Sequence, residues 1–376
     1  MVKMKRKKNR IVLYIIILLI GVGASILFFM RYQRVTSNML TCVEAFSFDT
    51  SVTNAMTIGD DILISTSDGK INLLDSEGKT LWTKDVGSSV FSLEISSDGK
   101  YVIIGAVEFH VVDVAGKEIF KKGMEDHVSF KSKYLKDGKI KFIFQSLSDL
   151  SLTAVTVDGK GKTLQTEKID DLGETCFIDI SSSGKILLSG ERGEVYIIEN
   201  GGFTKDANMD TKVSTIHTVF GYFFGDSTIV CGYRVSYDPE KPIPVYFFDE
   251  NLTIKKTLYF KNINDISLYD GVIVFSTKDG IVAYDENGKE VFAIDELGFQ
   301  GFSYLQNGTF RVCVFFKRTE GENADFVYKI DLLDAQNKKI GDYVYSSDTI
   351  PQLFLAANSQ NIYLIDKSHL KLISKD

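Results

Sequence analysis

The 376-residue chain has few cysteines, histidines and prolines, with four of each. No two cysteines lie close together and no C-x-x-C occurs, so the sequence shows no thiol-redox motif and no zinc-binding cysteine pair. The histidines form neither H-E-x-x-H nor a close cluster, which argues against zinc. A disulfide between cysteines that are distant in the sequence is an alternative that the sequence cannot test. These residues are Cys42, Cys176, Cys231 and Cys313, and His110, His127, His217 and His369.

Common sequence signatures of catalysis are also absent. There is no G-x-S-x-G and no P-loop. The many Asp-x-x-Gly segments lack the D-x-[DN]-x-[DN]-G spacing of a calcium loop, so we interpret them as hairpin turns. We therefore predict no catalytic, cofactor-binding or metal-binding residues, and a protein that is not an enzyme. A pair of glycosidase carboxylates among the fifty acidic residues is an alternative that sequence cannot test.

Acidic residues outnumber basic ones, 50 to 43. Residues 1–34 hold eight basic and no acidic residues, so the remainder carries 35 basic and 50 acidic residues, a difference of −15. A surface of this sign disfavours nucleic acid and other polyanions as partners, because phosphate binding depends on Lys and Arg. Solubility alone would also account for the charge.

A long apolar run lies near the N-terminus, from Ile11 to Met30, and contains no charged residue. Twenty residues at about 1.5 Å each give about 30 Å of helix, the thickness of the hydrocarbon core of a bilayer. Six basic residues precede the run, so the positive-inside rule keeps the N-terminus in the cytoplasm. We predict a single-pass cell-membrane protein with a basic cytoplasmic tip (1–10), a transmembrane helix (11–30), a linker (31–41) and an extracellular domain (42–376).

A cleaved signal peptide is the alternative interpretation of this run. Such a peptide has an apolar region of about 7–15 residues that ends at a small-residue cleavage site. The run is longer than that and ends in Phe28, Phe29 and Met30 without an A-x-A pattern. The sequence therefore favours an uncleaved signal anchor.

The rest of the chain repeats a pattern of four short strands. Its clearest copy, residues 89–120, predicts strands at 91–95, 101–105, 109–113 and 117–121, which we label A to D. Glycine in the turns supplies the positive φ that a tight hairpin needs, and Asp before it accepts backbone hydrogen bonds. A sheet this small cannot bury both faces alone, whereas sheets stacked in a closed ring cover one another.

The number of repeats predicts eight blades. Turns between strands C and D recur seven times, and residues 350–374 predict strands A, B and C of one more sheet. Residues 43–49 resemble a D strand, so we expect them to complete that sheet and remove its exposed edge. We predict an all-β, eight-bladed β-propeller, with seven blades as the alternative because the third and fifth units are irregular. The turns begin at Asp75, Asp113, Asp158, Asn200, Asp249, Asp285 and Asp334.

Short motifs in the repeats resemble those of known propellers. Residues 74–82, L-D-S-E-G-K-T-L-W, are similar to the repeat of the pyrroloquinoline-quinone-type propellers, and residues 96–101, S-S-D-G-K-Y, to a turn of WD40- and TolB-like propellers. The overall plan looks like an uncharacterised membrane-anchored propeller family of Gram-positive bacteria. This resemblance implies fold and location, not activity.

The quinoprotein dehydrogenases, which the first motif resembles, hold their quinone over a Trp floor beside a calcium site and carry a vicinal disulfide. This chain has one Trp and no adjacent cysteines. We therefore expect Trp82 to pack between neighbouring blades, and we predict no quinone cofactor.

Three connections between strands B and C are long: residues 145–151, 232–244 and 317–325, in the third, fifth and seventh blades. The B–C and D–A loops of a propeller emerge on one face, and loops on a rigid scaffold commonly bind partners. Three of the four prolines lie in the second of these loops and lower its ordering cost on binding. Our candidate partner-binding residues are Tyr233, Arg234, Tyr237, Lys317 and Arg318.

These features predict a non-catalytic binding or scaffold module at the cell envelope, with an envelope protein or a wall fragment as its partner. Two alternatives stay open: a quinoprotein-like or hydrolytic enzyme with a site at the central channel, and an extracellular sensor. A sensor is disfavoured because the cytoplasmic tip is only ten residues long. Surface loops that bind no partner would show the same lengths and compositions.

Overall fold

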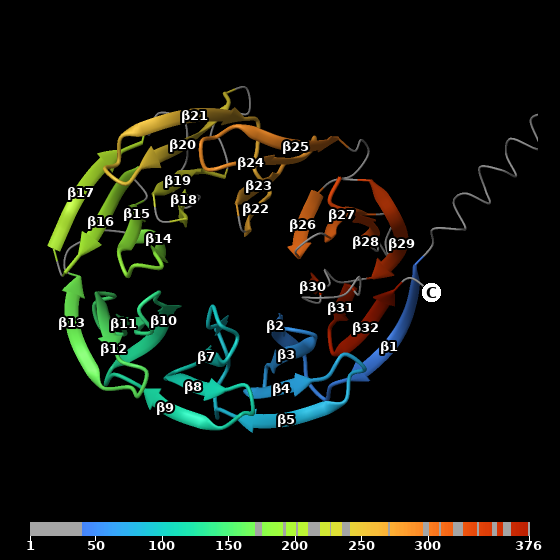
Figure 1. Ribbon diagram of the computed structural model, residues 1–376, viewed down its shortest axis with the longest axis horizontal. Helices are drawn as coiled ribbons and strands as arrows, with labels where there is room; N and C mark the ends of the chain where they lie inside the picture. The colour runs from blue at the N-terminus through green and yellow to red at the C-terminus, as the bar shows by residue number, and fades with distance from the viewer. Residues whose placement is uncertain are drawn as a thin grey trace, which may run out of the picture.

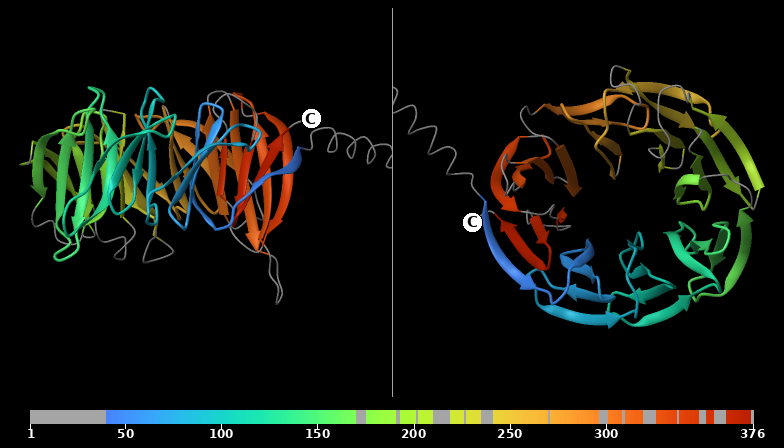
Figure 2. Two further views of the ribbon diagram at one scale, coloured as in Figure 1. Left: turned by 90° about the horizontal axis from the view of Figure 1, so that it is seen from below. Right: turned by 180° about the vertical axis from the view of Figure 1, so that it is seen from behind.

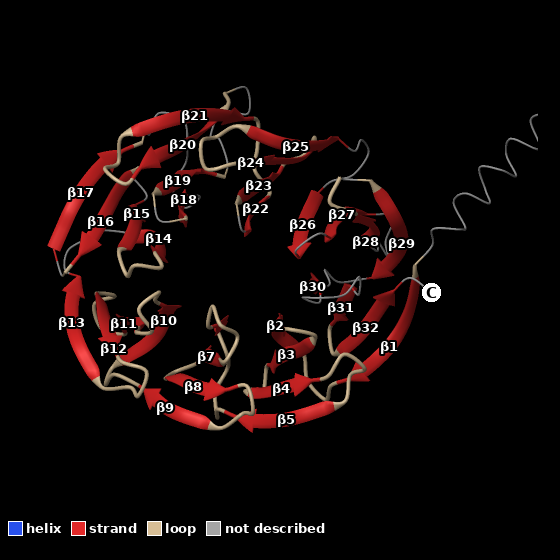
Figure 3. Cartoon of the chain, in the orientation of Figure 1, coloured by secondary structure: helices blue, strands red, loops and turns tan. Residues whose placement is uncertain are grey.

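The computed structural model describes residues 40–169, 175–190, 193–200, 202–209, 219–225, 227–234, 241–269, 271–295, 301–307, 310–318, 326–336, 338–347, 352–355 and 362–374. In these residues, thirty-two β-strands form eight four-stranded sheets. The sheets stand around a central axis like the blades of a propeller (Figure 1). The described chain consists of strands and loops, without a helix (Figure 3).

The blades follow chain order. Blade 1 contains β2 (Val52–Ile58), β3 (Asp61–Thr66), β4 (Lys70–Leu74) and β5 (Thr80–Asp85). Blade 2 contains β6 (Ser92–Ile95), β7 (Tyr101–Gly105), β8 (Phe109–Asp113) and β9 (Glu118–Lys122). Blade 3 contains β10 (His127–Tyr134), β11 (Ile140–Ser146), β12 (Leu152–Val157) and β13 (Thr163–Ile169). Blade 4 contains β14 (Thr175–Ile180), β15 (Ile186–Gly190), β16 (Glu194–Glu199) and β17 (Gly202–Asn208).

The second half continues in the same way. Blade 5 contains β18 (Val219–Phe224), β19 (Thr228–Tyr233), β20 (Ile243–Asp249) and β21 (Ile254–Phe260). Blade 6 contains β22 (Asp265–Tyr269), β23 (Val272–Ser276), β24 (Gly280–Tyr284) and β25 (Glu290–Asp295). Blade 7 contains β26 (Gly301–Asn307), β27 (Phe310–Arg318), β28 (Phe326–Leu333) and β29 (Lys339–Ser347). Blade 8 contains β30 (Gln352–Leu355), β31 (Ile362–Asp366), β32 (His369–Ser374) and β1 (Thr41–Ser47).

Strand A of each blade lies nearest the axis and strand D forms the outer rim (Figures 1 and 2). The middle strands are covered by the neighbouring blades on both sides, so every residue of β12 and β15 is buried. The outer strand β5 instead alternates between exposed and half-buried side chains. This difference explains why the B and C strands appear in the sequence as nearly continuous apolar runs.

The eighth blade is built from both ends of the chain, as predicted. β1 pairs antiparallel with β32, and Cys42 lies opposite Ile373. The fold begins slightly before the predicted boundary at residue 42, because Leu40 is buried and its N–H donates to the carbonyl of Asp342 at 2.9 Å. Eight blades, rather than the alternative of seven, are therefore confirmed.

The aspartates that open six of the C–D turns accept backbone hydrogen bonds, as expected. Asp75 Oδ1 accepts the N–H of Glu77 at 3.0 Å and the N–H of Lys79 at 2.8 Å, and Gly78 has a φ of 87°. These carboxylates are therefore occupied by the turns themselves, and in the blade-5 turn Leu252 takes the positive φ that glycine supplies elsewhere. The same pair of bonds forms at Asp113, Asp158, Asp249, Asp285 and Asp334.

Trp82 packs between blades 1 and 2, which confirms its predicted structural role. It lies on β5, and its Nε1 donates to the carbonyl of Val114 at 2.9 Å. A Cβ atom added to Gly116 would lie only 2.7 Å from the indole ring. The indole therefore rests directly on the C–D turn of the next blade.

Two cysteines are core residues, as expected. Cys231 and Cys313 are completely buried, whereas Cys42 is half-buried, and all three are free thiols. Burial raises the pKa of Cys231 to about 12, so this thiol remains protonated and unreactive at neutral pH. The side chain of Cys176 lies outside the described residues.

The predicted transmembrane helix, the cytoplasmic tip and most of the linker lie outside the described residues. From Leu40 onward, the described chain contains no helix with the length and apolar character that crossing a bilayer requires.

Candidate functional site

The two faces of the ring are built from different connections. Leu147 N–H, in the B–C loop of blade 3, donates to the carbonyl of Asp126, in the preceding D–A loop, at 2.9 Å. Ile263 N–H in a D–A loop likewise donates to the carbonyl of Arg234 in a B–C loop, at 3.1 Å. The B–C and D–A loops therefore share one face, as expected, and we call it the loop face. The opposite face, which carries the A–B and C–D turns, is the turn face.

Tyr233 is not a surface residue, and its prediction as a partner-binding residue was wrong. It is the last residue of β19, is 2 % exposed, and packs in the apolar core between blades 4 and 5. It pairs with Val219, and Pro244 belongs to β20, so the loop is shorter than predicted and spans residues 234–242. The reason is that burying the large aromatic ring between blades stabilises the fold more than leaving it exposed on the rim.

Arg234 is half-buried at the start of this loop, beside Tyr222 on the inner strand β18. Burial raises the pKa of Tyr222, and the charge of Arg234 and a hydrogen bond from it oppose that rise. Arg234 is thus engaged with the inner wall of its own blade. Tyr237 lies outside the described residues.

Lys317 and Arg318 are strand residues rather than loop residues. They end β27 and lie opposite Val327 and Phe326 in β28. Their side chains lie outside the described part of the chain. Blade 6 stands between blades 5 and 7 (Figure 1), so the two sets of predicted residues come from blades that are not adjacent.

The structure reveals an apolar group on the loop face that the sequence did not suggest. Phe91, Val107, Leu147 and Leu150, from loops of blades 2 and 3, are between 50 % and 67 % exposed. Phe130, on the inner strand β10, is 44 % exposed. We call these five residues the loop-face apolar patch. Single exposed apolar residues are normal, but several within two adjacent blades make this region a candidate binding surface.

A β-bulge explains the exposure of Phe130. The pairing of β10 with β11 shifts between Ser129 and Lys131, which leaves Phe130 as the extra residue. A bulge changes the direction of a side chain and often lies beside a functional site. The exposed position of Phe130 therefore coincides with the bulge.

Two of these residues, Val107 and Leu147, line a surface groove of about 490 Å³ that combines apolar with acidic side chains. Lys121 pairs with one of its carboxylates, that of Glu108, at 3.0 Å. Because carboxylates adjoin exposed apolar groups, the groove suits a segment with a large apolar side chain beside Lys or Arg. The residues that give it this character are Val107, Met124, Leu147, Glu108, Glu125 and Asp126.

The backbone around the groove is locally strained. Asp126 has a φ of 56° and Leu150 a φ of 59°, in the left-handed region. This conformation costs a residue such as leucine about 1–2 kcal/mol, and strained residues cluster at functional sites.

Asp149 holds the adjoining loop in place. Its Oδ1 accepts the N–H of Ser151 at 3.0 Å and the hydroxyl of Ser151 at 2.8 Å. Hydrogen bonds from Ser146 and Ser151 lower the pKa of Asp149 to about 2, so the carboxylate is charged at physiological pH. The loop is therefore organised before any partner arrives. The sequence signals were the length of the B–C loop 145–151 and two leucines within its otherwise polar segment, S-L-S-D-L-S.

Charged side chains on the inner strands serve to connect blades. Asp179 of β14 pairs with Lys131 of β10 at 3.3 Å, and its Oδ2 accepts the N–H of Phe223 in β18 at 2.9 Å. These carboxylate contacts tie three consecutive inner strands together. Within the described residues, no three His, Cys, Asp or Glu side chains are grouped as a metal site would require.

Solved propellers share the fold at low sequence identity. The C-terminal WD40 domain of Sif2 matches with a TM-score of 0.63 and 11 % identity, over 90 % of this chain and 99 % of that chain. The computationally designed Ika8 protein gives 0.62 and 14 %, over 88 % and 98 % of the two chains. BamB from Moraxella catarrhalis gives 0.55 and 12 %, over 90 % and 100 %. No protein-family model and no curated protein sequence matches the chain. These likenesses show the propeller fold alone.

Proposed function

We propose that this protein is a non-catalytic binding module at the cell envelope, which holds a partner protein on the loop face of blades 2 and 3. The groove supports this proposal, because exposed apolar side chains adjoin carboxylates there on a rigid scaffold. An exposed apolar surface is unfavourable in water until a partner covers it. The propeller fold, which WD40 and BamB structures share, is compatible with a binding role.

The partner is a protein segment that carries an apolar side chain flanked by Lys or Arg. The apolar side chain covers Val107 and Leu147, and the basic groups face Glu125 and Asp126. The excess of acidic residues beyond residue 34 favours a basic protein and disfavours nucleic acid. Arg234, Tyr237, Lys317 and Arg318, from blades 5 and 7, stay as sequence-based predictions of further contact residues.

Charge introduced into the groove tests this function. Leu147→Asp should abolish chemical cross-linking of the full-length protein to its partner in intact cells while leaving the melting temperature unchanged, because Leu147 is 65 % exposed. Leu164→Asp is the matched control, since Leu164 is 48 % exposed on the outer strand of the same blade. Cross-links that survive Leu147→Asp unchanged would contradict the proposal.

The proposal includes the location. Residues 11–30 anchor the chain as a single span, with the N-terminus in the cytoplasm and the propeller outside the cell, as in the Gram-positive family that the plan resembles. The basic tip adds contact with anionic lipid headgroups. The full-length protein should therefore stay in the membrane fraction after an alkaline carbonate wash, and protease added to intact cells should remove the propeller. A propeller found in the wash, or protected from protease, would refute this placement.

A further inference from the structure

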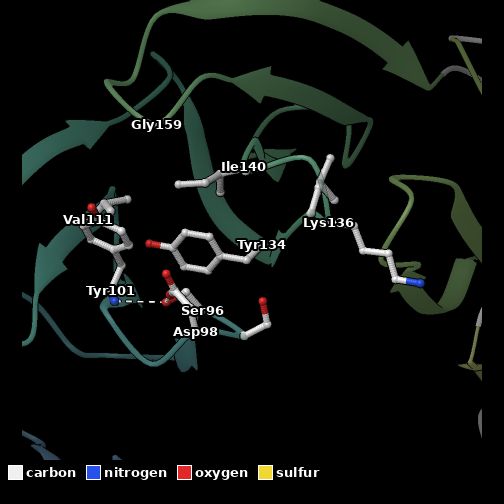
Figure 4. Close-up of a pocket in the computed structure, with 11 residues that line it drawn as sticks. Ser96, Asp98, Tyr101, Val111, Tyr134, Lys136, Ile140 and Gly159 are labelled. Carbon is white, nitrogen blue, oxygen red and sulfur yellow. Dashed lines mark hydrogen bonds between the residues drawn. The ribbon is translucent and has the colours of Figure 1, made fainter.

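A second cleft lies on the turn face between blades 2 and 3 (Figure 4). Its volume is about 350 Å³, within the range of small-molecule sites. Blade 2 contributes the A–B turn around Ser96 and Asp98 and the first residue of β7, Tyr101. Blade 3 contributes Tyr134, the last residue of β10, and the turn that follows it. The cleft is separate from the loop-face groove, because the two lie at opposite ends of the same strands.

Two tyrosines give the cleft its aromatic character. The rings of Tyr101 and Tyr134 are nearly parallel, with an interplanar angle of 23° and centroids 6.4 Å apart. Tyr101 is 37 % exposed, whereas the hydroxyl of Tyr134 is buried and points toward Tyr101 (Figure 4). Val111 and Ile140 complete the apolar lining.

The Tyr134 hydroxyl has no hydrogen-bond partner among the described residues. Burial, together with the nearby carboxylate of Glu94, raises the pKa of Tyr134, so the phenol keeps its proton and remains a donor. The backbone N–H of Tyr134 donates to Glu94 Oε1 at 3.0 Å, and this bond holds the end of β10 in place. A buried donor without an acceptor is rare in folded proteins and calls for an explanation, such as an absent ligand oxygen.

The polar edge of the cleft carries little unbalanced charge. Ser96 Oγ donates to Asp98 Oδ1 at 2.7 Å and accepts the N–H of Tyr101 at 3.0 Å (Figure 4). Asp98 Oδ2 also pairs with Lys100 at 3.0 Å. The carboxylate of Asp98 is therefore already paired, and the cleft offers aromatic faces beside hydrogen-bonding groups. One further charged residue, Lys136, lines the cleft.

We propose that this cleft binds the ring of a neutral sugar. A pyranose has an apolar C–H face that packs on an aromatic ring, and hydroxyl groups that both donate and accept hydrogen bonds. Tyr101 rotates aside to admit the sugar and then packs against its C–H face. The uncovered Tyr134 hydroxyl donates to a sugar oxygen. The carboxylate of Asp98 accepts a hydrogen bond from a sugar hydroxyl at the cleft edge.

Calorimetric titration of the detergent-solubilised full chain with maltose, cellobiose and N,N′-diacetylchitobiose tests the proposal. At least one disaccharide should bind saturably at millimolar concentration or below. Tyr134→Phe keeps the ring and removes the hydroxyl, so it should weaken binding by about tenfold or more. Tyr101→Ala should also weaken it. The matched control is Tyr259→Phe, which alters a 67 % exposed tyrosine on β21 and should leave binding unchanged.

A second measurement separates a ligand site from a structural role. Because the Tyr134 hydroxyl has no hydrogen-bond partner in the described part of the chain, Tyr134→Phe should melt at the wild-type temperature or above it. A clear fall in its melting temperature would assign the hydroxyl to the fold and overturn the proposal. Absence of binding by all three disaccharides, or equal binding by wild type and Tyr134→Phe, would also overturn it.

Discussion

At the scale of single residues, neighbouring blades are joined by a D-strand side chain that covers the glycine of the next C–D turn. Trp82 covers Gly116, and Phe120 covers Gly161, where an added Cβ would lie 2.6 Å from the ring. Glycine is therefore required at these positions for two reasons. It adopts the positive φ of the turn, and it leaves room for the aromatic ring of the preceding blade. The glycine of the Asp-x-x-Gly turn thus contributes to the packing between blades as well as to the hairpin.

Gly116→Ala should be more destabilising than Gly99→Ala. Both glycines have positive φ, 81° and 70°, but a Cβ at Gly99 would meet nothing within 4 Å. We expect Gly99→Ala to lower the free energy of unfolding by about 1 kcal/mol, the backbone cost alone. Gly116→Ala should lower it by about 3 kcal/mol, because Trp82 must also move. Urea unfolding of both variants measures the difference, and equal losses would show that the indole contact adds nothing.

A buried ion pair within blade 3 should behave differently in single and double variants. Lys141 Nζ lies 3.6 Å from Glu167 Oε2 and donates to the carbonyl of Gly184 at 2.7 Å. Both side chains are less than a tenth exposed, at 7 % and 4 %. Glu167→Leu alone should lower the free energy of unfolding by about 3–5 kcal/mol, because it leaves a buried charge. Lys141→Met combined with Glu167→Leu should recover most of that loss in urea unfolding. The prediction would be contradicted if the double variant lost as much free energy of unfolding as Lys141→Met and Glu167→Leu lose when their separate losses are added.

Glu118 should make the contact between blades 1 and 2 sensitive to acid. Its Oε2 lies 3.0 Å from His110 Nδ1 and 3.0 Å from Lys84 Nζ. Hydrogen bonds from His110 and then Lys84 lower the pKa of Glu118. Since the folded pKa lies below the unfolded one, the stabilisation is present above the ordinary pKa of a glutamate. It is lost as the pH falls through the folded value.

Between neutral and acidic pH, the wild type should therefore lose more stability than Glu118→Gln. The difference should be at most about 1 kcal/mol, because a partly exposed ion pair is screened by solvent. Urea unfolding at several pH values measures it. Glu77→Gln, in an exposed turn, is the control and should follow the wild type. Parallel curves for wild type and Glu118→Gln would refute the assignment.

At the scale of elements, the ring closes through β1. This strand pairs with β32 along most of its length and supplies the missing D strand of blade 8. Across the joint to blade 7, the Tyr345 hydroxyl donates to Asp366, and Lys371 Nζ donates to the Tyr345 hydroxyl at 2.8 Å. Backbone pairing between β1 and β32 completes blade 8, and a side-chain network joins blade 8 to blade 7.

Removal of β1 should open the ring. A chain that begins at Phe48 lacks the D strand of blade 8, whereas a chain that begins at Leu40 retains it. We expect the shorter chain to melt at a clearly lower temperature and to aggregate, because β32 becomes an unpaired edge. Thermal unfolding followed by circular dichroism, with light scattering, compares the two. Equal melting temperatures would show that β1 does not contribute to closure.

At the scale of the whole molecule, the same two blades present different chemistry at their two ends. The loop face offers exposed apolar groups with carboxylates, and the turn face offers paired tyrosines. The rigid sheets between them separate these surfaces, so each can be altered without the other.

The two surfaces should therefore act independently. Leu147→Asp should leave disaccharide binding unchanged, and Tyr134→Phe should leave cross-linking to the partner protein unchanged. Calorimetry and cross-linking of both variants provide the four measurements. A variant that impairs both activities without lowering the melting temperature would show that the blades transmit a change between the faces.

The sequence by itself determined the all-β class, the eight blades, the shared eighth blade and the hairpin turns. These features depend on local patterns, namely short apolar strands separated by hairpin turns, which recur along the chain and need no knowledge of distant contacts. Only the tertiary structure decided that Tyr233 is core, that Leu147 and Val107 line one groove, and that the Tyr134 hydroxyl has no partner among the described residues. The physical reason is that burial and pairing depend on which blades stack together, and one blade's residues do not encode what its neighbour places against them.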